Sequence, residues 1–224
     1  MISNRNAYNV LDQKQLALFY LTAKEKVIEA GYASEIDWQE DVSLDSLDES
    51  TFLREAAWVI LSSGFRESIL RRCFQRISIA FLNWSSAEEI IARQESCRSQ
   101  ALKCFNNIKK INAIVKIANR VSEEGIDNIR DEIRNRGIDY IQEYPFMGPV
   151  TSRHLAKNIG VLIAKPDRHL GKIAACYGYD SVDEMCCLIS EIVGDTIPVI
   201  DVVIWRYATI TKNYEKNLRL LVSI

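Results

Sequence analysis

The spacing of the apolar residues constrains the fold of this 224-residue chain more than any other feature. These residues recur mostly at helical intervals, while the alternation of β-branched and polar residues that is typical of strands is scarce. Hydrophobic residues make up 48% of the chain, and it contains only 9 glycines and 4 prolines, which interrupt helices. The sequence therefore predicts an all-α protein, large enough for one large domain or two small helical lobes.

Individual helices can be placed from their periodicity, caps and breakers. We expect helices at residues 10–30, 51–64, 67–83, 97–121 with a break near 106–107, 127–136, 167–178, and from Pro198 onward. Ser86 with Glu89, and Ser181 with Glu184, form capping boxes, which mark helix starts. The acidic segment 34–50 is expected to be irregular.

The composition argues against membrane and metal-cluster proteins. No apolar run approaches the roughly 20 residues that span a bilayer, and the polar start Met-Ile-Ser-Asn-Arg-Asn lacks the apolar core of a signal peptide. The 6 cysteines include no Cys-x-x-Cys pair, so buried, reduced thiols are expected rather than a metal or iron–sulfur centre. We therefore expect a cytoplasmic protein without a membrane partner or cofactor.

The net charge of −2 conceals a segregation of charge along the chain. Residues 35–55 contain eight acids and one base, whereas residues 66–120 contain eleven bases and four acids. Because phosphate contacts depend on the local field, the basic segment is compatible with a nucleic-acid partner. Solvated helix faces that happen to be basic remain the alternative.

The stretch from Tyr144 to Leu170 carries the strongest functional signal. Gly148-Pro149 interrupts the chain at a tight hairpin between helices, because glycine permits a positive φ and proline favours the first helical position. The exposed N–H groups of such a helix start can bind an anion. An ordinary helical hairpin without a ligand is the alternative.

Asp167 follows Pro166 at the expected N-cap of the next helix. Capping alone would explain this residue. Backbone hydrogen bonds at a helix start also keep a part-buried carboxylate ionised. Such a carboxylate can stabilise a positively charged sugar transition state or orient an attacking water.

The hairpin at 144–158, followed by Pro166-Asp167-Arg168-His169, resembles the helix-hairpin-helix (HhH-GPD) DNA glycosylases, which cut the bond between a base and its deoxyribose. The segment from Trp58 to Gly64 resembles the early core helix of that family and the loop that enters DNA. The resemblance implies a two-lobed helical fold, with an active-site cleft between the lobes. The expected lobes are residues 52–162, with the hairpin at about 140–158, and residues 1–51 plus 163–224.

The resemblance also suggests roles for individual residues. Asp167 would be catalytic, and Lys165 and His169 would support it. Phosphate-binding candidates are Met147, Gly148, Val150, Thr151, His154 and Arg66. Base-pocket candidates are Trp58, Trp38, Tyr32, Phe65, Trp205 and Asp201, and each aromatic can equally be a core residue. Asp201 can instead pair with an arginine such as Arg206 or Arg168. No metal is expected, apart from a possible structural cation at the hairpin.

Four departures from the family pattern sharpen the expectation. Phe146 replaces the first glycine of the usual Gly-x-Gly hairpin, and Gly64 stands where a DNA-inserting glutamine is common. Val150 occupies the position at which lyase-type members carry a Schiff-base lysine, so we expect hydrolysis by water without strand cleavage. The four-cysteine cluster of some members is missing.

The sequence thus favours a monomeric, monofunctional DNA N-glycosylase that flips a modified base out of double-stranded DNA. A single carboxylate supplies little acid to the leaving base, which favours bases that leave readily. The substrate would be an alkylated base, as in base excision repair, or a hypermodified base on foreign DNA, as in antiviral defence. The alternatives are a non-catalytic helix-hairpin-helix DNA-binding module and a helical interaction protein that uses the acidic segment 35–55.

Overall fold

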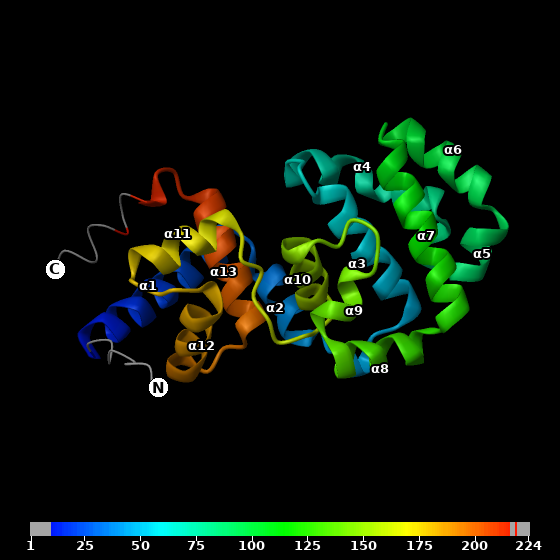
Figure 1. Ribbon diagram of the computed structural model, residues 1–224. Helices are drawn as coiled ribbons and strands as arrows, with labels where there is room; N and C mark the ends of the chain where they lie inside the picture. Colours follow the sequence, from blue (N-terminus) through cyan, green and yellow to red (C-terminus); the bar gives the residue numbers. More distant parts are fainter. Residues whose placement is uncertain (1–9, 216–217, 219–224) are drawn as a thin grey trace. The chain divides into compact units, whose positions relative to one another are not determined.

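The computed structural model describes residues 10–215 and residue 218, and within this part of the chain the regular structure is entirely helical (Figure 1). The all-α class is therefore confirmed. The helices in chain order are α1 (Val10–Glu29), α2 (Ala33–Asp41), η1 (Leu44–Ser46), α3 (Glu49–Ser62), α4 (Glu67–Ala80), η2 (Leu82–Trp84), α5 (Ala87–Ala92), α6 (Gln94–Cys104), α7 (Ile108–Glu124), α8 (Ile126–Arg136), α9 (Ile138–Gln142), α10 (Pro149–Asn158), α11 (Arg168–Cys176), α12 (Val182–Val193) and α13 (Ile197–Ile210).

The chain divides into two compact units. Unit 1 combines residues 1–41 with 162–224, and unit 2 is the continuous segment 42–161. The division near residue 41 differs from the sequence-based placement near 51. Residues 42–51 are held onto unit 2 by α8, because Arg130 Nη1 donates to Leu47 O at 3.0 Å and Arg134 Nη2 lies 2.8 Å from Asp45 Oδ1.

The core of unit 1 forms around α13, which contacts α1, α2, α11 and α12 (Figure 1). Its sequence Ile-Pro-Val-Ile-Asp-Val-Val-Ile is apolar on nearly every side, so the helix requires neighbours around most of its circumference. Val203 and Ile204 are fully buried there, as are Leu16 and Tyr20 of α1. The charged residues Asp201 and Arg206 of α13 are buried too.

The core of unit 2 forms where α7 packs on α3, α5 and α6. The apolar face of α7 buries Ile111, Ile114 and Ile117. Helix α3 also contacts α10, which carries the second half of the hairpin. Gly160, just after α10, has φ +91°, and a Cβ there would lie 2.4 Å from Leu44 N, so only glycine fits this close approach.

The expectation of an irregular segment at 34–50 is wrong, because this segment contains α2 and η1. Ile36 and Gln39 are buried one turn apart, whereas the acidic Asp37 and Glu40 are exposed. The segment is thus an amphipathic helix whose buried face is narrow, and α13 covers that face.

Several local expectations are confirmed. Ser86 and Ser181 accept hydrogen bonds from the N–H groups of Glu89 and Glu184, which confirms them as N-caps, the first half of each expected capping box. The break near 106–107 separates α6 from α7. All six cysteines are free thiols, but only Cys73, Cys97 and Cys186 are buried, while Cys104 and Cys176 are half-buried and Cys187 is exposed. None of the described helices combines the length and apolarity that a bilayer crossing requires.

Candidate functional site

The hairpin is formed by α9, a six-residue turn and α10. The expectation that glycine supplies the positive φ is wrong, because Phe146 has φ +66° and Gly148 has φ −74°. Gly148 is the N-cap of α10. A Cβ there would meet only Thr151 Oγ1, at 3.9 Å, so packing within the protein does not demand glycine. Because Gly148 has no side chain, the backbone there is open to the approach of a ligand.

The start of α10 has no side-chain cap. Thr151 Oγ1 instead donates to the carbonyl oxygen of Phe146 at 2.7 Å. The backbone N–H groups of Val150 and Thr151 precede the first helical hydrogen bond, from Ser152 N to Gly148 O, and have no acceptor among the described residues. These two N–H groups, at the positive end of the helix dipole, therefore suit an anion.

The other candidates for phosphate binding differ in their burial and contacts. The side chain of Met147 is buried, and its N–H donates to Tyr144 O at 3.2 Å, so Met147 anchors the turn instead of facing solvent. The Val150 side chain is exposed, and His154 is half-buried on α10. Arg66, the remaining phosphate candidate, is exposed at the N-cap of α4.

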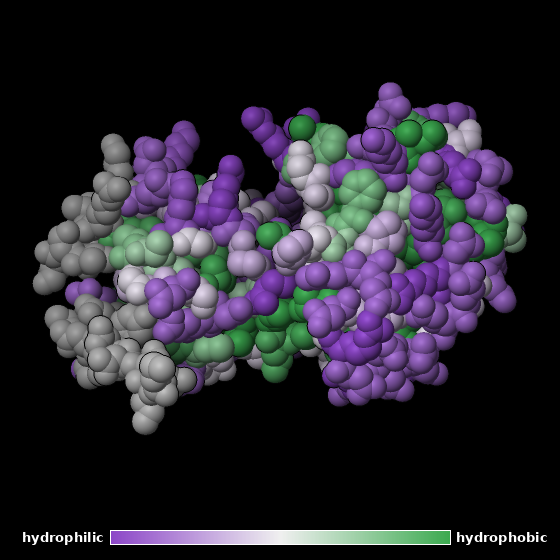
Figure 2. Space-filling view, viewed as in Figure 1, coloured by the Kyte–Doolittle hydropathy of each residue, from purple (hydrophilic) through white to green (hydrophobic). Residues whose placement is uncertain are grey.

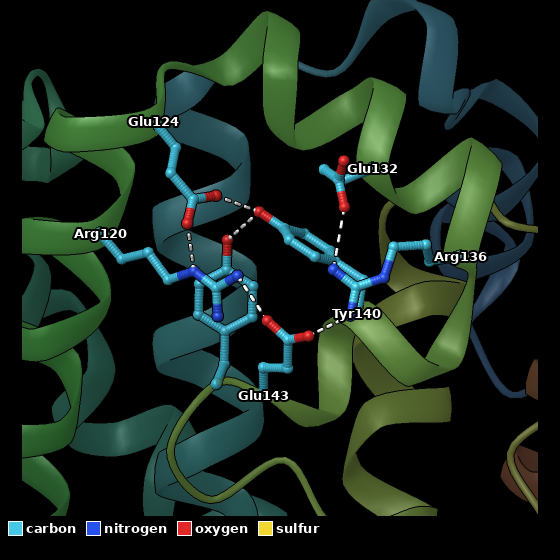
Figure 3. Close-up of polar contacts among 7 residues, drawn as sticks. Arg120, Glu124, Glu132, Arg136, Tyr140 and Glu143 are labelled. Carbon is cyan, nitrogen blue, oxygen red and sulfur yellow. Dashed lines mark hydrogen bonds and ion pairs between the residues drawn. The ribbon is translucent and has the colours of Figure 1, made fainter.

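A polar network that the sequence analysis missed fixes the first half of the hairpin (Figure 3). Arg120 of α7 lies 2.6 Å from Glu124 Oε1 and 2.9 Å from Glu143 Oε2, and its guanidinium is 4.3 Å from the centroid of the Tyr144 ring. Tyr140 donates a hydrogen bond to Glu124, and its hydroxyl lies 2.9 Å from that of Tyr144. The chain entering the turn is thereby tied to α7.

Burial and the nearby Glu124 carboxylate raise the pKa of Tyr140 to about 12, so its hydroxyl stays protonated and remains a donor. Arg136 of α8 extends the network, since it pairs with Glu143 and with Glu132 (Figure 3). The i,i+4 spacings of Arg120 with Glu124 and of Glu132 with Arg136 were the signals of this network that the sequence contained.

Asp167 is the N-cap of α11 in unit 1. Its Oδ1 accepts hydrogen bonds from His169 N at 2.8 Å and Leu170 N at 3.1 Å. Its Oδ2 accepts none from the described residues, and the side chain is half-buried. One carboxylate oxygen therefore fixes the side chain to the helix, while the other remains open to a ligand.

The loop before Asp167 is fixed by Asp201. Asp201 is 2% exposed, and its Oδ2 accepts a hydrogen bond from the backbone N–H of Lys165 at 2.7 Å. The carbonyl of Lys165 in turn accepts from Asp167 N at 2.7 Å. Asp201 thus positions the chain directly before Asp167, a role that the sequence analysis did not consider.

His169 makes contacts with both ring nitrogens. Its Nδ1 lies 2.9 Å from Tyr214 Oη, and Arg168 Nε donates to Nε2 at 3.3 Å. Burial lowers the pKa of His169, which favours a neutral ring that accepts from Arg168 and donates to Tyr214. The imidazole is therefore engaged in fixing the start of α11.

The aromatic pocket candidates fall into both units. Within unit 1, Tyr32 and Trp205 lie together against Arg206, whose guanidinium is 4.3 Å and 4.6 Å from their ring centroids. Arg206 also makes a bidentate pair with Glu35, at 2.8 Å and 2.6 Å. Trp38 is half-buried on α2.

Unit 2 contains Trp58 and Phe65. The Trp58 ring meets Phe74 edge-on at a centroid distance of 5.0 Å. Phe65, in the loop before α4, is 45% exposed, and its ring centroid lies 5.0 Å from that of Phe105. The structure thus places Tyr32 and Trp205 each against Arg206 in unit 1, and pairs Phe65 with Phe105 in unit 2.

No group of three or more His, Cys, Asp and Glu side chains arranged for metal binding occurs in the part of the chain that the structure describes. Compared with known proteins, the chain matches no protein family, no curated protein and no solved structure.

Proposed function

We propose that this chain is a monofunctional DNA N-glycosylase of the HhH-GPD fold, which acts as a cytoplasmic monomer on double-stranded DNA. The observation that carries the proposal is the geometry of Asp167. Its Oδ1 is fixed by two backbone N–H groups, while its Oδ2 accepts no hydrogen bond from the described residues and the side chain as a whole is half-buried. A carboxylate held this way keeps its position as a sugar cation forms next to it.

In the proposed reaction, the N-glycosidic bond of a flipped nucleotide breaks and the base leaves with the bonding electrons. Asp167 stabilises the resulting positive charge on the sugar and orients a water, whose oxygen bonds to the sugar carbon while one of its protons passes to the Asp167 carboxylate. Because Asp167 supplies charge and no acid, the substrate is a base that leaves readily. An alkylated, cationic base has this property, whereas release of a hypermodified base on foreign DNA would need a further proton donor in the pocket.

The hairpin supports the DNA-binding part of the proposal. The open N–H groups of Val150 and Thr151 suit a backbone phosphate, and Gly148 leaves room for it to approach. Val150 has no amine, so no Schiff base forms with the sugar and the strand stays intact.

The first prediction concerns Asp167→Asn. Asparagine caps a helix about as well as aspartate, so the variant should fold normally but lack the negative charge. We expect base release to fall roughly 100-fold or more, as when a transition-state charge is no longer stabilised. The measurement is release of free base, by mass spectrometry, from duplexes that carry alkylated or hypermodified bases.

Asp48→Asn is the matched control, because Asp48 is also an aspartate N-cap and accepts from Thr51 N at 2.6 Å at the start of α3. It should keep full activity. Equal rates of base release by Asp167→Asn and the wild type would disprove the glycosylase proposal. A covalent enzyme–DNA adduct trapped with borohydride would disprove the separate claim that the protein has no lyase activity.

The second candidate function is a non-catalytic helix-hairpin-helix DNA-binding module, which is favoured by the capping role of Asp167 itself. Under this alternative, wild-type protein binds duplex DNA and releases no base from any of the duplexes tested.

A further inference from the structure

Unit 2 contains a cavity of about 350 Å³ between the start of α4 and the loop that joins α6 to α7. Its walls include Phe65, Ile69, Arg72, Arg76, Phe105 and Asn106. This volume lies at the lower end of the range for small-molecule sites, which is roughly 300–1,000 Å³. In the space-filling view, hydrophobic side chains are interspersed with hydrophilic ones over the start of α4 (Figure 2).

The cavity has an uncompensated positive charge. Arg72 and Arg76 lie one turn apart on α4, are exposed, and have no carboxylate partner among the described residues. Arg71 on the same helix differs, since it pairs with Glu67 at 2.5 Å. None of the residues that line the cavity is acidic. Two adjacent guanidinium groups without carboxylates suit a phosphate, which they can bind through several donors.

The apolar walls of the cavity include an exposed aromatic ring. Phe65 and Ile69 are 45% and 52% exposed, and both line the cavity. Lys110 Nζ lies 4.6 Å from the Phe65 ring centroid and donates to Leu61 O at 3.0 Å and to Ser63 O. The loop that carries Phe65 is therefore fixed at the cavity by a buried lysine.

We propose that this cavity binds a nucleotide. The base packs on Phe65 and Phe105, since every base offers a π-face to an aromatic side chain. The phosphate lies between Arg72 and Arg76, and Asn106 lines the same cavity. The site goes beyond the proposed glycosylase function, because it adds a ligand site whose residues all belong to unit 2, whereas Asp167 belongs to unit 1.

The test is calorimetric titration of the full chain with deoxyadenosine 5′-monophosphate (dAMP), a thymidylate pentamer, deoxyadenosine and inorganic phosphate. We expect the first or second ligand to bind at least tenfold more tightly than the nucleoside or phosphate alone. Tighter binding of dAMP identifies a free nucleotide as the source of the ligand, and tighter binding of the pentamer identifies a nucleic-acid strand.

The double variant Arg72→Gln/Arg76→Gln should weaken binding at least tenfold. Arg71 is on the same helix but outside the cavity, so Arg71→Gln should change the affinity for the ligand by no more than about twofold. Phosphate binding as tight as dAMP and the pentamer would overturn the nucleotide assignment, and so would affinities that the double variant leaves unchanged.

A second measurement locates the ligand. Cys104 lines the cavity and is half-buried, whereas Cys187 is exposed in unit 1 and serves as an internal reference. Bound ligand should slow the alkylation of Cys104 by N-ethylmaleimide severalfold and leave Cys187 unaffected, as followed by mass spectrometry. Equal rates with and without ligand would overturn the site.

Asp167→Asn should bind the ligand normally, so failure of the glycosylase proposal and failure of this one give different results.

Discussion

Phe146 has a backbone conformation that residues with a Cβ rarely adopt. Its φ of +66° lies in the left-handed region, which raises the free energy of such a residue by roughly 1–2 kcal/mol. The Thr151 hydroxyl hydrogen-bonds to its carbonyl oxygen and helps to hold this conformation. The ring itself is 42% exposed, so burial of the side chain offsets only part of the strain.

The second prediction compares Phe146→Gly with Phe146→Ala. Both substitutions remove the ring, but only alanine retains the Cβ that makes a positive φ unfavourable. We expect Phe146→Gly to be more stable than Phe146→Ala by about 1 kcal/mol, as measured by urea unfolding. Equal stabilities, or a more stable alanine variant, would show that the turn does not strain this residue.

Asp167 and Asp201 show what can be predicted for a single residue from sequence. The capping role of Asp167 was predictable, because both of its partners, His169 and Leu170, lie within three residues. The partner of Asp201 is a backbone N–H 36 residues away. Only the packing of α13 against the loop before α11 places it there, and no local pattern encodes that contact.

At the scale of elements, the hairpin depends on helices outside it. Helix α9 has only five residues, which is too short to be stable by itself. Its Tyr140, together with Tyr144 after it, packs against Arg120 of α7, and Glu143 pairs with Arg120 and with Arg136 of α8 (Figure 3). The position of the turn was predictable from Gly148-Pro149, whereas these supporting contacts depend on how three helices pack.

The third prediction concerns pH and Glu143. Hydrogen bonds from Arg136 and Arg120 lower the pKa of Glu143 below its usual value of about 4.3. The resulting stability is fully present above that usual value and is lost as pH falls through the lower folded-state pKa. We expect Glu143→Gln to be less stable than wild type at pH 7, with the difference shrinking below about pH 4.

Glu123→Gln is the matched control, because Glu123 is exposed on α7 and has no ion pair with the described residues. Urea unfolding at pH 7 and at stepwise lower pH provides the measurement. If the difference in free energy of unfolding between wild type and Glu143→Gln stays constant with pH, protonation of Glu143 is not linked to stability. The same conclusion follows if Glu123→Gln shows the same pH dependence.

At the scale of the whole molecule, the two units differ in how the chain forms them. Unit 1 needs both ends of the described chain, because α1 and α2 pack on α13, whereas unit 2 is continuous. The class and most helices were predictable from apolar spacing. Helix α2 was missed because Ile36 and Gln39 give it too narrow a buried face, and that face is recognisable only once α13 is in place.

The final prediction is that residues 42–161 fold without the rest of the chain. This segment contains its own core between α3 and α7, and the close approach of Gly160 to Leu44 joins its two ends. We expect a helical circular dichroism spectrum and a cooperative urea transition. The fragment contains the hairpin and the α4 cavity but not Asp167, so it should bind dAMP or the thymidylate pentamer as the full chain does and release no base. A fragment that unfolds without a cooperative transition would show that unit 2 depends on unit 1, and base release by the fragment would show that Asp167 is not required.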